Sequence, residues 1–244
     1  MAYNPYQSPQ SEIKPPSIAI SNGNTLEDGI AGHYQFKIMD IMNEGLARSN
    51  GFKGTFWGVF IVYIFITLVV SLGSGIALGL AGLIDNILAA ALVQLAHAAI
   101  LTPMMAGIMI LGARHADHQE INFKMMFEPY GKMIPLFLVY VLMALLVTFG
   151  FLLVIIPGIY LFVGYGFSLL LVAEKQIGVW KALESSRQAV HHYWFKFLGF
   201  LLILTLVNFG GLISIIGWIW TFPLSYCALG VLYRRVFGVT PAQA

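Results

Sequence analysis

Long apolar stretches separated by short polar segments form the main pattern along the chain. Four stretches contain no Asp, Glu, Lys or Arg, and they cover residues 54–84, 86–113, 133–173 and 197–233. A membrane-spanning helix needs about 20 mostly apolar residues, so the first two stretches fit one span each and the last two are long enough for two. Pro157 and Gly158 interrupt the third stretch, and Gly210, Gly211 and Gly217 interrupt the fourth, which predicts a turn within each.

These turns divide the chain into six predicted spans, arranged as three helical hairpins. The spans lie near residues 55–80, 87–112, 134–155, 158–174, 197–214 and 218–235. Asp85 and Asn86 join the first two spans. The fourth and sixth spans are short, so we expect either tilting of these helices or local thinning of the bilayer around them. The predicted fold class is an all-α integral membrane helical bundle.

A polar segment with helical periodicity precedes each hairpin. In the segment 179–196, Val179, Leu183 and Val190 share one face of a helix, while Lys181 and Glu184 lie on another. Interfacial amphipathic helices of this kind lie in the plane of the lipid headgroups, with the apolar face down. This segment therefore supplies candidate contacts with anionic lipid headgroups or with a partner protein: Trp180, Lys181, Arg187, His191, His192, Trp194 and Lys196.

Basic residues are absent from the predicted hairpin tips, which lie near 83–87, 155–159 and 213–218. Because positively charged segments stay in the cytoplasm, we expect both termini there and the tips outside. Residues 1–34 are polar and interrupted by prolines, and such a segment buries too little apolar surface to fold. We expect a disordered cytoplasmic tail over 1–34 and a short C-terminal tail over 237–244.

A weak internal repeat relates the hairpins. At an offset of 60 residues, seven positions within 149–162 carry the same residue as their counterparts. At an offset of 120, Pro103 falls on Pro223 and Arg114 on Arg234. Repeats of this kind are common in membrane folds. The register predicts three repeat units, at about 35–115, 120–175 and 178–236, within a membrane domain that covers 35–236.

Composition supports the membrane assignment and excludes several function classes. Hydrophobic residues make up 59% of the 244 residues and charged residues only 10%, with a mean hydropathy of +0.81. A soluble domain carries roughly 25% charged residues, so this chain cannot coat a water-exposed globule of its size. The net charge of +2 gives no basis for a nucleic-acid partner, and the single cysteine, Cys227, excludes an internal disulfide or a Cys-based zinc cluster.

Three polar residues within the predicted spans are candidates for an intramembrane site. Gln94 and His97 stand at i,i+3 in the second span, and Asn208 lies in the fifth. Polar groups at membrane depth are costly and point to function, but they also join helices by hydrogen bonds worth only about 1 kcal/mol each. The pattern favours hydrogen bonding between helices over a substrate or proton path, and both remain open.

No catalytic or cofactor-binding set is evident in the sequence. It contains no phosphate-binding glycine loop, no nucleophile elbow and no paired carboxylates within the spans. His115 and His118, with Asp117 and Glu120, form the one cluster of metal-ligand types. A solvated surface segment accounts for it better than a metal site, because the spacing defines no further ligand. We therefore expect no enzyme activity, no cofactor and no metal.

The stretch 155–204 resembles known membrane proteins. Its pattern is Pro157-Gly158-Ile159-Tyr160, a helix ending at Glu174, then Trp180, Ala182, Leu183, Ser185 and Ser186, and an aromatic entry at Trp194 into the next span. The pattern resembles uncharacterised bacterial inner-membrane families that are similar to the membrane portion of glycerophosphoryl diester phosphodiesterases. The resemblance implies a bacterial inner-membrane location. Those phosphodiesterases carry catalysis on a separate soluble domain that this sequence lacks, so the resemblance argues against that activity.

The sequence thus predicts a non-enzymatic inner-membrane protein that interacts with lipid or with a partner in envelope homeostasis. The partner is expected to be another membrane protein or a second copy of the chain. The alternative is a transporter for a small or amphipathic substrate, with a polar path at Gln94, His97 and Asn208. Protection against a membrane-directed toxin is a third possibility for which no residue gives evidence.

Overall fold

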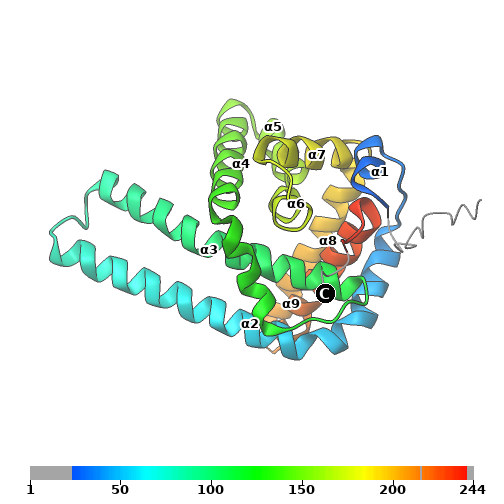
Figure 1. Ribbon diagram of the computed structural model, residues 1–244, viewed down its shortest axis with the longest axis horizontal. Helices are drawn as coiled ribbons and strands as arrows, with labels where there is room; N and C mark the ends of the chain where they lie inside the picture. The colour runs from blue at the N-terminus through cyan, green and yellow to red at the C-terminus, as the bar shows by residue number, and fades with distance from the viewer. Residues whose placement is uncertain (1–23, 215, 241–244) are drawn as a thin grey trace, which may run out of the picture.

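The computed structural model describes residues 24–214 and 216–240, and the regular structure of these residues is entirely helical. The helices follow one another as α1 (Leu26–Ala31), α2 (Ile38–Leu80), α3 (Ile87–Ala116), the 3-10 helix η1 (Phe123–Lys132), α4 (Met133–Leu153), α5 (Ile155–Gly164), α6 (Ser168–Lys175), α7 (Val179–His191), α8 (Trp194–Ile213) and α9 (Trp218–Phe237). The all-α fold class is confirmed, and Figure 1 shows the arrangement of the helices.

Five helical segments of the described chain are long and apolar enough to cross a membrane: Ile38–Leu80, Ile87–Ala116, Phe123–Leu153, Ile155–Lys175 and Trp194–Ile213. The protein is therefore a multi-pass membrane protein. The sixth predicted span corresponds to α9, which is not among the five. Helix α9 is less apolar because it contains Thr221, Ser225 and Tyr226 and ends in Arg234 and Arg235. The sixth span therefore stays a prediction.

The chain turns between α2 and α3, between α4 and α5, and between α8 and α9, as the hairpin pattern predicts. The second turn comes earlier than expected, at Val154, which has extended backbone (φ −163°, ψ 153°). Pro157 then lies in the first turn of α5, where a missing N–H costs little. Gly150 and Gly158 let the two helices cross closely, because a Cβ on Gly150 would lie 3.0 Å from the Cα of Gly158.

Two of the predicted helices have different bounds in the structure. The polar segment before the first span is not a separate interfacial helix, because α2 runs unbroken for 43 residues. The fourth span is not one helix, because α5 ends at Gly164 and α6 begins at Ser168. Ser186 of α7 explains the break: its Oγ donates to the Gly164 carbonyl (2.7 Å) and accepts from the Phe167 N–H (3.2 Å). The interrupted backbone is thus satisfied inside the protein.

The prediction of a disordered tail over 1–34 was wrong for residues 24–34. Residues 24–34 are ordered, with Thr25 and Asp28 forming a capping box at the start of α1. Tyr34 is buried, and its hydroxyl donates to the Ala189 carbonyl of α7. At the other end, Phe237 and Val239 are buried in the core. Residues 1–23 and 241–244 lie outside the described residues.

The larger buried cluster reaches from α2 and α3 through α4, α6, α7 and α8 to α9, and the backbones of α2, α3 and α9 approach closely where these helices cross. A Cβ on Gly230 of α9 would collide with the Gly112 carbonyl of α3, and one on Gly45 of α2 would lie 2.9 Å from Ala228 of α9. These glycines are required by the close approach of the backbones. Beyond the crossing, α2 and α3 continue as a long antiparallel pair that leaves the rest of the molecule (Figure 1). We call residues 60–101 the arm and the other described residues the body.

Candidate functional site

Helix α7 is amphipathic, but most of its candidate contact residues already have partners within the protein. The Arg187 guanidinium pairs with the Glu184 carboxylate at 2.6 Å and reaches the Tyr160 hydroxyl at 3.3 Å. Hydrogen bonding from Arg187 lowers the pKa of the Glu184 carboxyl. His191 Nδ1 lies 3.0 Å from the same tyrosine hydroxyl. Arg187 and His191 therefore hold α5 against α7.

The following residues of the same segment attach neighbouring elements. His192 Nε2 lies 3.0 Å from the Ile30 carbonyl of α1, and Trp194 donates to the Tyr160 carbonyl at 3.4 Å. The Lys196 ammonium lies 4.7 Å from the centre of the Tyr193 ring. Trp180 and Lys181 are exposed, with no hydrogen bond to any described residue. His191, His192 and Lys196 are exposed as well, so Trp180 and Lys181 are the exposed members of the predicted set that have no partner among the described residues.

Gln94 and His97 line a polar groove, whose volume is about 390 Å³. His97 Nε2 lies 3.0 Å from Ser74 Oγ across the arm. The Gln94 side chain makes no hydrogen bond to any described residue. The remaining lining residues come from the arm and from α3, α4 and α6: Tyr63, Thr67, Ser71, Ala98, Leu101, Thr102, Met105, Tyr140 and Leu169.

An apolar chamber of about 530 Å³ adjoins this groove. The two cavities share three lining residues, Met105, Tyr140 and Leu169. The chamber lies among α3, α4, α8, α9 and the break between α5 and α6, and its other lining residues include Met109, Met143, Ala144, Val147, Phe162, Phe167, Phe200 and Leu229. Binding sites for small molecules are typically 300–1,000 Å³, mostly apolar, with a few polar groups. The groove and the chamber together have that character.

Asn208 does not lie with Gln94 and His97. Its Nδ2 donates to the Leu204 carbonyl at 2.8 Å and to Ser225 Oγ at 2.6 Å. Trp218 donates to the Asn208 carbonyl at 3.2 Å. These contacts join α8 to α9, so the structure places Asn208 within one hairpin, as a link between helices.

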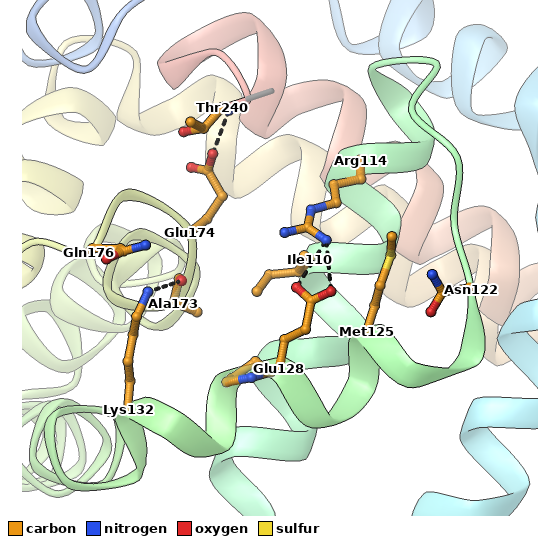
Figure 2. Close-up of a pocket in the computed structure, with 11 residues that line it drawn as sticks. Ile110, Arg114, Asn122, Met125, Glu128, Lys132, Ala173, Glu174, Gln176 and Thr240 are labelled. Carbon is orange, nitrogen blue, oxygen red and sulfur yellow. Dashed lines mark hydrogen bonds and ion pairs between the residues drawn. The ribbon is translucent and has the colours of Figure 1, made fainter. Parts of the chain in front are cut away.

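A second, polar pocket of about 520 Å³ lies between α3, η1 and α6 (Figure 2). Arg114 pairs with Glu128 at 3.0 Å, and the Lys132 ammonium donates to the Ala173 carbonyl at 3.1 Å. Glu174 forms another wall, and its carboxylate accepts from the Tyr233 hydroxyl at 2.6 Å. We call this cavity the polar pocket; its lining also includes Ile110, Asn122, Met125, Pro129, Gln176 and Thr240.

The histidine cluster contributes to packing between helices. His115 Nε2 lies 2.9 Å from the Arg48 carbonyl, and the Arg48 guanidinium lies 2.8 Å from His118 Nε2. Among the described residues, no group of three or more His, Cys, Asp or Glu side chains is arranged to hold a metal. Next to this cluster, Glu44 accepts from three arginines, Arg48, Arg234 and Arg235.

The sequence pattern did not predict the polar pocket or the two partners of Glu44 on α9, Arg234 and Arg235. Arg114 and Glu174 occupy equivalent ends of predicted return spans, which was the one available signal. Glu128 and Lys132 belong to the η1 segment, for which the sequence pattern predicted only an apolar helix face. Nothing in the local pattern shows that these four side chains surround one cavity, because they lie on separate elements.

The fold and these cavities define a multi-pass, all-α membrane protein with a mixed polar and apolar cleft between its helices. No protein family, curated protein or solved structure matches the chain.

Proposed function

We propose that this protein is a non-enzymatic lipid-binding protein of the bacterial inner membrane, with a role in envelope homeostasis. The apolar chamber beside the polar groove is the observation that carries the proposal. A lipid has the same division into an apolar chain and a polar end. Both termini are proposed to be cytoplasmic, because the basic residues lie away from the hairpin tips.

The chamber suits an acyl chain. Met105, Met109 and Met143 line it, and methionine side chains adapt readily to irregular apolar ligands. Phe162, at the edge of the chamber, is 61% exposed, so the cavity borders the region that bilayer lipid occupies. A chain can therefore enter sideways from the membrane without passing through water.

The groove suits the polar end of the same molecule. His97 lies ten residues after the start of α3, about 15 Å along the helix axis at 1.5 Å per residue. That is close to the middle of a hydrocarbon core about 30 Å thick. An amide such as that of Gln94, without a hydrogen-bond partner at this depth, is costly. An ester or hydroxyl group of a bound lipid would supply that partner.

The predicted internal repeat is part of the proposal. Gly107 of α3 packs against the Met126 backbone of η1. A shift of 60 residues takes these two positions to Phe167 and Ser186 of α7, which are also in contact, since the Phe167 N–H donates to the Ser186 hydroxyl. The contact of Gly45 with Ala228 joins the last return helix to the first polar segment. This cyclic order of contacts supports three copies of one unit arranged around the body.

Native mass spectrometry of the protein released from membranes in mild detergent tests the lipid proposal. Ala144→Trp fills the chamber, and Leu145→Trp is the matched control because Leu145 is 62% exposed and does not line it. We expect a retained lipid in the wild type and in Leu145→Trp, and its loss in Ala144→Trp. Equal lipid retention by both tryptophan variants would contradict the proposal.

Transport of an amphipathic substrate is the second candidate, and the open groove at Gln94 favours it. It requires Gln94 and His97 but not Asn208, which is engaged with Ser225. In a lipid-flux assay in proteoliposomes, Gln94→Leu and His97→Leu should abolish flux. Flux that survives both changes would exclude a path through this groove.

A further inference from the structure

We propose that the polar pocket between α3, η1 and α6 binds a phosphate group. This site is separate from the apolar chamber and from the α7 surface. Phosphate is favoured because several N–H donors of Arg114 and Lys132 in the pocket form no hydrogen bond with the acceptors there. A phospholipid headgroup and a soluble phosphate ester share this chemistry.

Two cations face the pocket with donors to spare. Figure 2 shows Arg114 and Lys132 reaching into it from opposite sides. Within the described chain, Lys132 bonds only to the Ala173 carbonyl and forms no ion pair, which leaves two of its three N–H donors. Arg114 contacts Glu128 through Nη1 alone, which leaves Nε and Nη2. Arginine and lysine are the residues that hold phosphate in proteins.

The acidic residues of the pocket are largely engaged elsewhere. Glu174 accepts from the Tyr233 hydroxyl and the Thr240 N–H and lies 3.5 Å from the Lys175 ammonium. Its side chain is only 3% exposed. Glu128 is paired with Arg114. An incoming phosphate therefore meets carboxylates whose charge is already balanced.

Gln176 adds a second kind of evidence. It follows α6 with φ +56°, in the left-handed region where glycine is the usual residue. Its side chain lines the pocket beside Lys132 (Figure 2). The amide of Gln176 and that of Asn122 supply further neutral donors to the pocket.

The position of the pocket favours a lipid as the source of the phosphate. Phe123 and Phe127 of η1 are 42% and 40% exposed beside it. Exposed aromatic residues at a helix that precedes a span are typical of the headgroup region. With about 520 Å³, the pocket has room for a headgroup larger than phosphate itself.

The test uses the full-length protein, depleted of lipid in dodecyl maltoside, and native mass spectrometry. One titration uses dioleoyl phosphatidylglycerol, and a second uses dioleoylglycerol, which has the same chains without the phosphate. Lys132→Gln removes the charge and retains a donor for Ala173. Lys124→Gln is the matched control, because Lys124 is exposed on the same helix and does not line the pocket.

We expect the wild type and Lys124→Gln to prefer phosphatidylglycerol, and Lys132→Gln to bind it about tenfold more weakly, the effect of one lost charged hydrogen bond. Equal affinity of the two lysine variants for phosphatidylglycerol, or of the wild type for the two lipids, would exclude a lipid headgroup from the pocket. Should Lys132→Gln aggregate, Arg114→Gln/Glu128→Gln removes one cation together with its partner and carries the same expectation.

A parallel titration with glycerol 3-phosphate, followed by phosphorus NMR line broadening, distinguishes the two sources. Binding of phosphatidylglycerol alone identifies a lipid headgroup site. Lys132-dependent binding of glycerol 3-phosphate identifies a soluble phosphate ester. The absence of binding in both titrations refutes the proposal. None of these outcomes depends on the apolar chamber, since Ala144 lies outside the polar pocket.

Discussion

The helices α2 and α3 each have one half in the body and one half in the arm. In α2, seven residues between Ile41 and Val59 are buried, and none of the described residues after Val59 is. In α3, burial begins at Thr102 and continues to Ala116. The same two helices therefore change from a packed core to an open pair within one turn. What differs is their neighbours, because α9 and η1 pack along the body halves and meet the arm at its base, where Phe222 contacts Phe60 and Tyr130 bonds to the Ile100 carbonyl.

The glycines of the two halves have different surroundings. In the body, Gly45, Gly107 and Gly112 lie where another backbone leaves no room for a Cβ. In the arm, Gly73, Gly75 and Gly79 have no atom within 4 Å of a Cβ position. Small residues in membrane helices normally permit close approach. In the arm these glycines meet no partner among the described residues.

The largest effect is expected from removing the charge that holds the body halves together. Glu44→Ala leaves Arg48, Arg234 and Arg235 without their common acceptor. Breaking a mostly buried ion pair costs about 3 kcal/mol, and the Glu44 side chain is 20% exposed. We expect a marked fall in the melting temperature measured by size-exclusion chromatography after heating.

Asp40→Ala is the control for that experiment. Asp40 lies one turn before Glu44 on the same helix, is exposed and forms no ion pair with a described residue. It should cost less than about 1 kcal/mol, the usual contribution of an acid in the first turn of a helix. Similar losses in the two variants would mean that Glu44 does not hold α2 and α9 together.

The next effect tests the two kinds of glycine directly, with one substitution in each region. Gly230→Ala places a methyl group against the Gly112 carbonyl and should cost about 2–3 kcal/mol through overpacking. Gly75→Ala places its methyl group where no described residue lies within 4 Å and should stabilise its helix by up to about 1 kcal/mol. Thermal unfolding in detergent measures both changes.

Repeating the Gly75→Ala measurement in native membranes tests whether the arm has a protein neighbour there. A gain in both media fits an arm surrounded by lipid alone. A gain in detergent that becomes a loss in native membranes would show that the arm packs against another protein there. A loss in both would mean that the arm folds back on itself in solution, contrary to the open pair described here.

The sequence predicted the hairpins well, because uncharged length and turn residues are local properties. It missed the continuity of α2, since an amphipathic segment and an apolar span share one helical period and no residue marks a boundary between them. It predicted the fourth span as one helix because the interruption depends on Ser186, which comes from a helix 20 residues further along the chain. The periodicity of apolar residues does not reveal hydrogen bonds between residues far apart in the sequence.

For the candidate site too, local features were predicted and contacts between distant residues were not. The cost of polar groups at depth identified Gln94 and His97, and both line the groove. The same reasoning wrongly grouped Asn208 with them, because it gives no information about which helix supplies the partner, here Ser225 of α9. The polar pocket was missed because Arg114 and Glu174 are 60 residues apart.

The smallest predicted effect is a loss of stability at acidic pH that affects the body and not the arm. The pKa of Glu184 is lowered from its usual 4.5 by the hydrogen bond from Arg187. A carboxyl with a depressed folded-state pKa stabilises the protein at pH values above its ordinary pKa, and that contribution is lost as the pH falls from 4.5 through the folded-state value. Both side chains of the pair are about a third exposed, so solvent screening limits the loss to less than about 1 kcal/mol.

Unfolding measured at pH 6 and at pH 3.5 checks this expectation, with Glu184→Gln as the comparison. The wild type should lose more stability than the variant over that interval, because only the wild type has the Glu184 carboxylate to protonate. Between residues 60 and 101 the one carboxyl is Asp85, at the tip of the arm. A nitroxide spin label attached to Gly75→Cys should therefore keep its mobility as α7 loosens. A gain in mobility of the arm equal to that of α7 would show that the two regions do not respond separately.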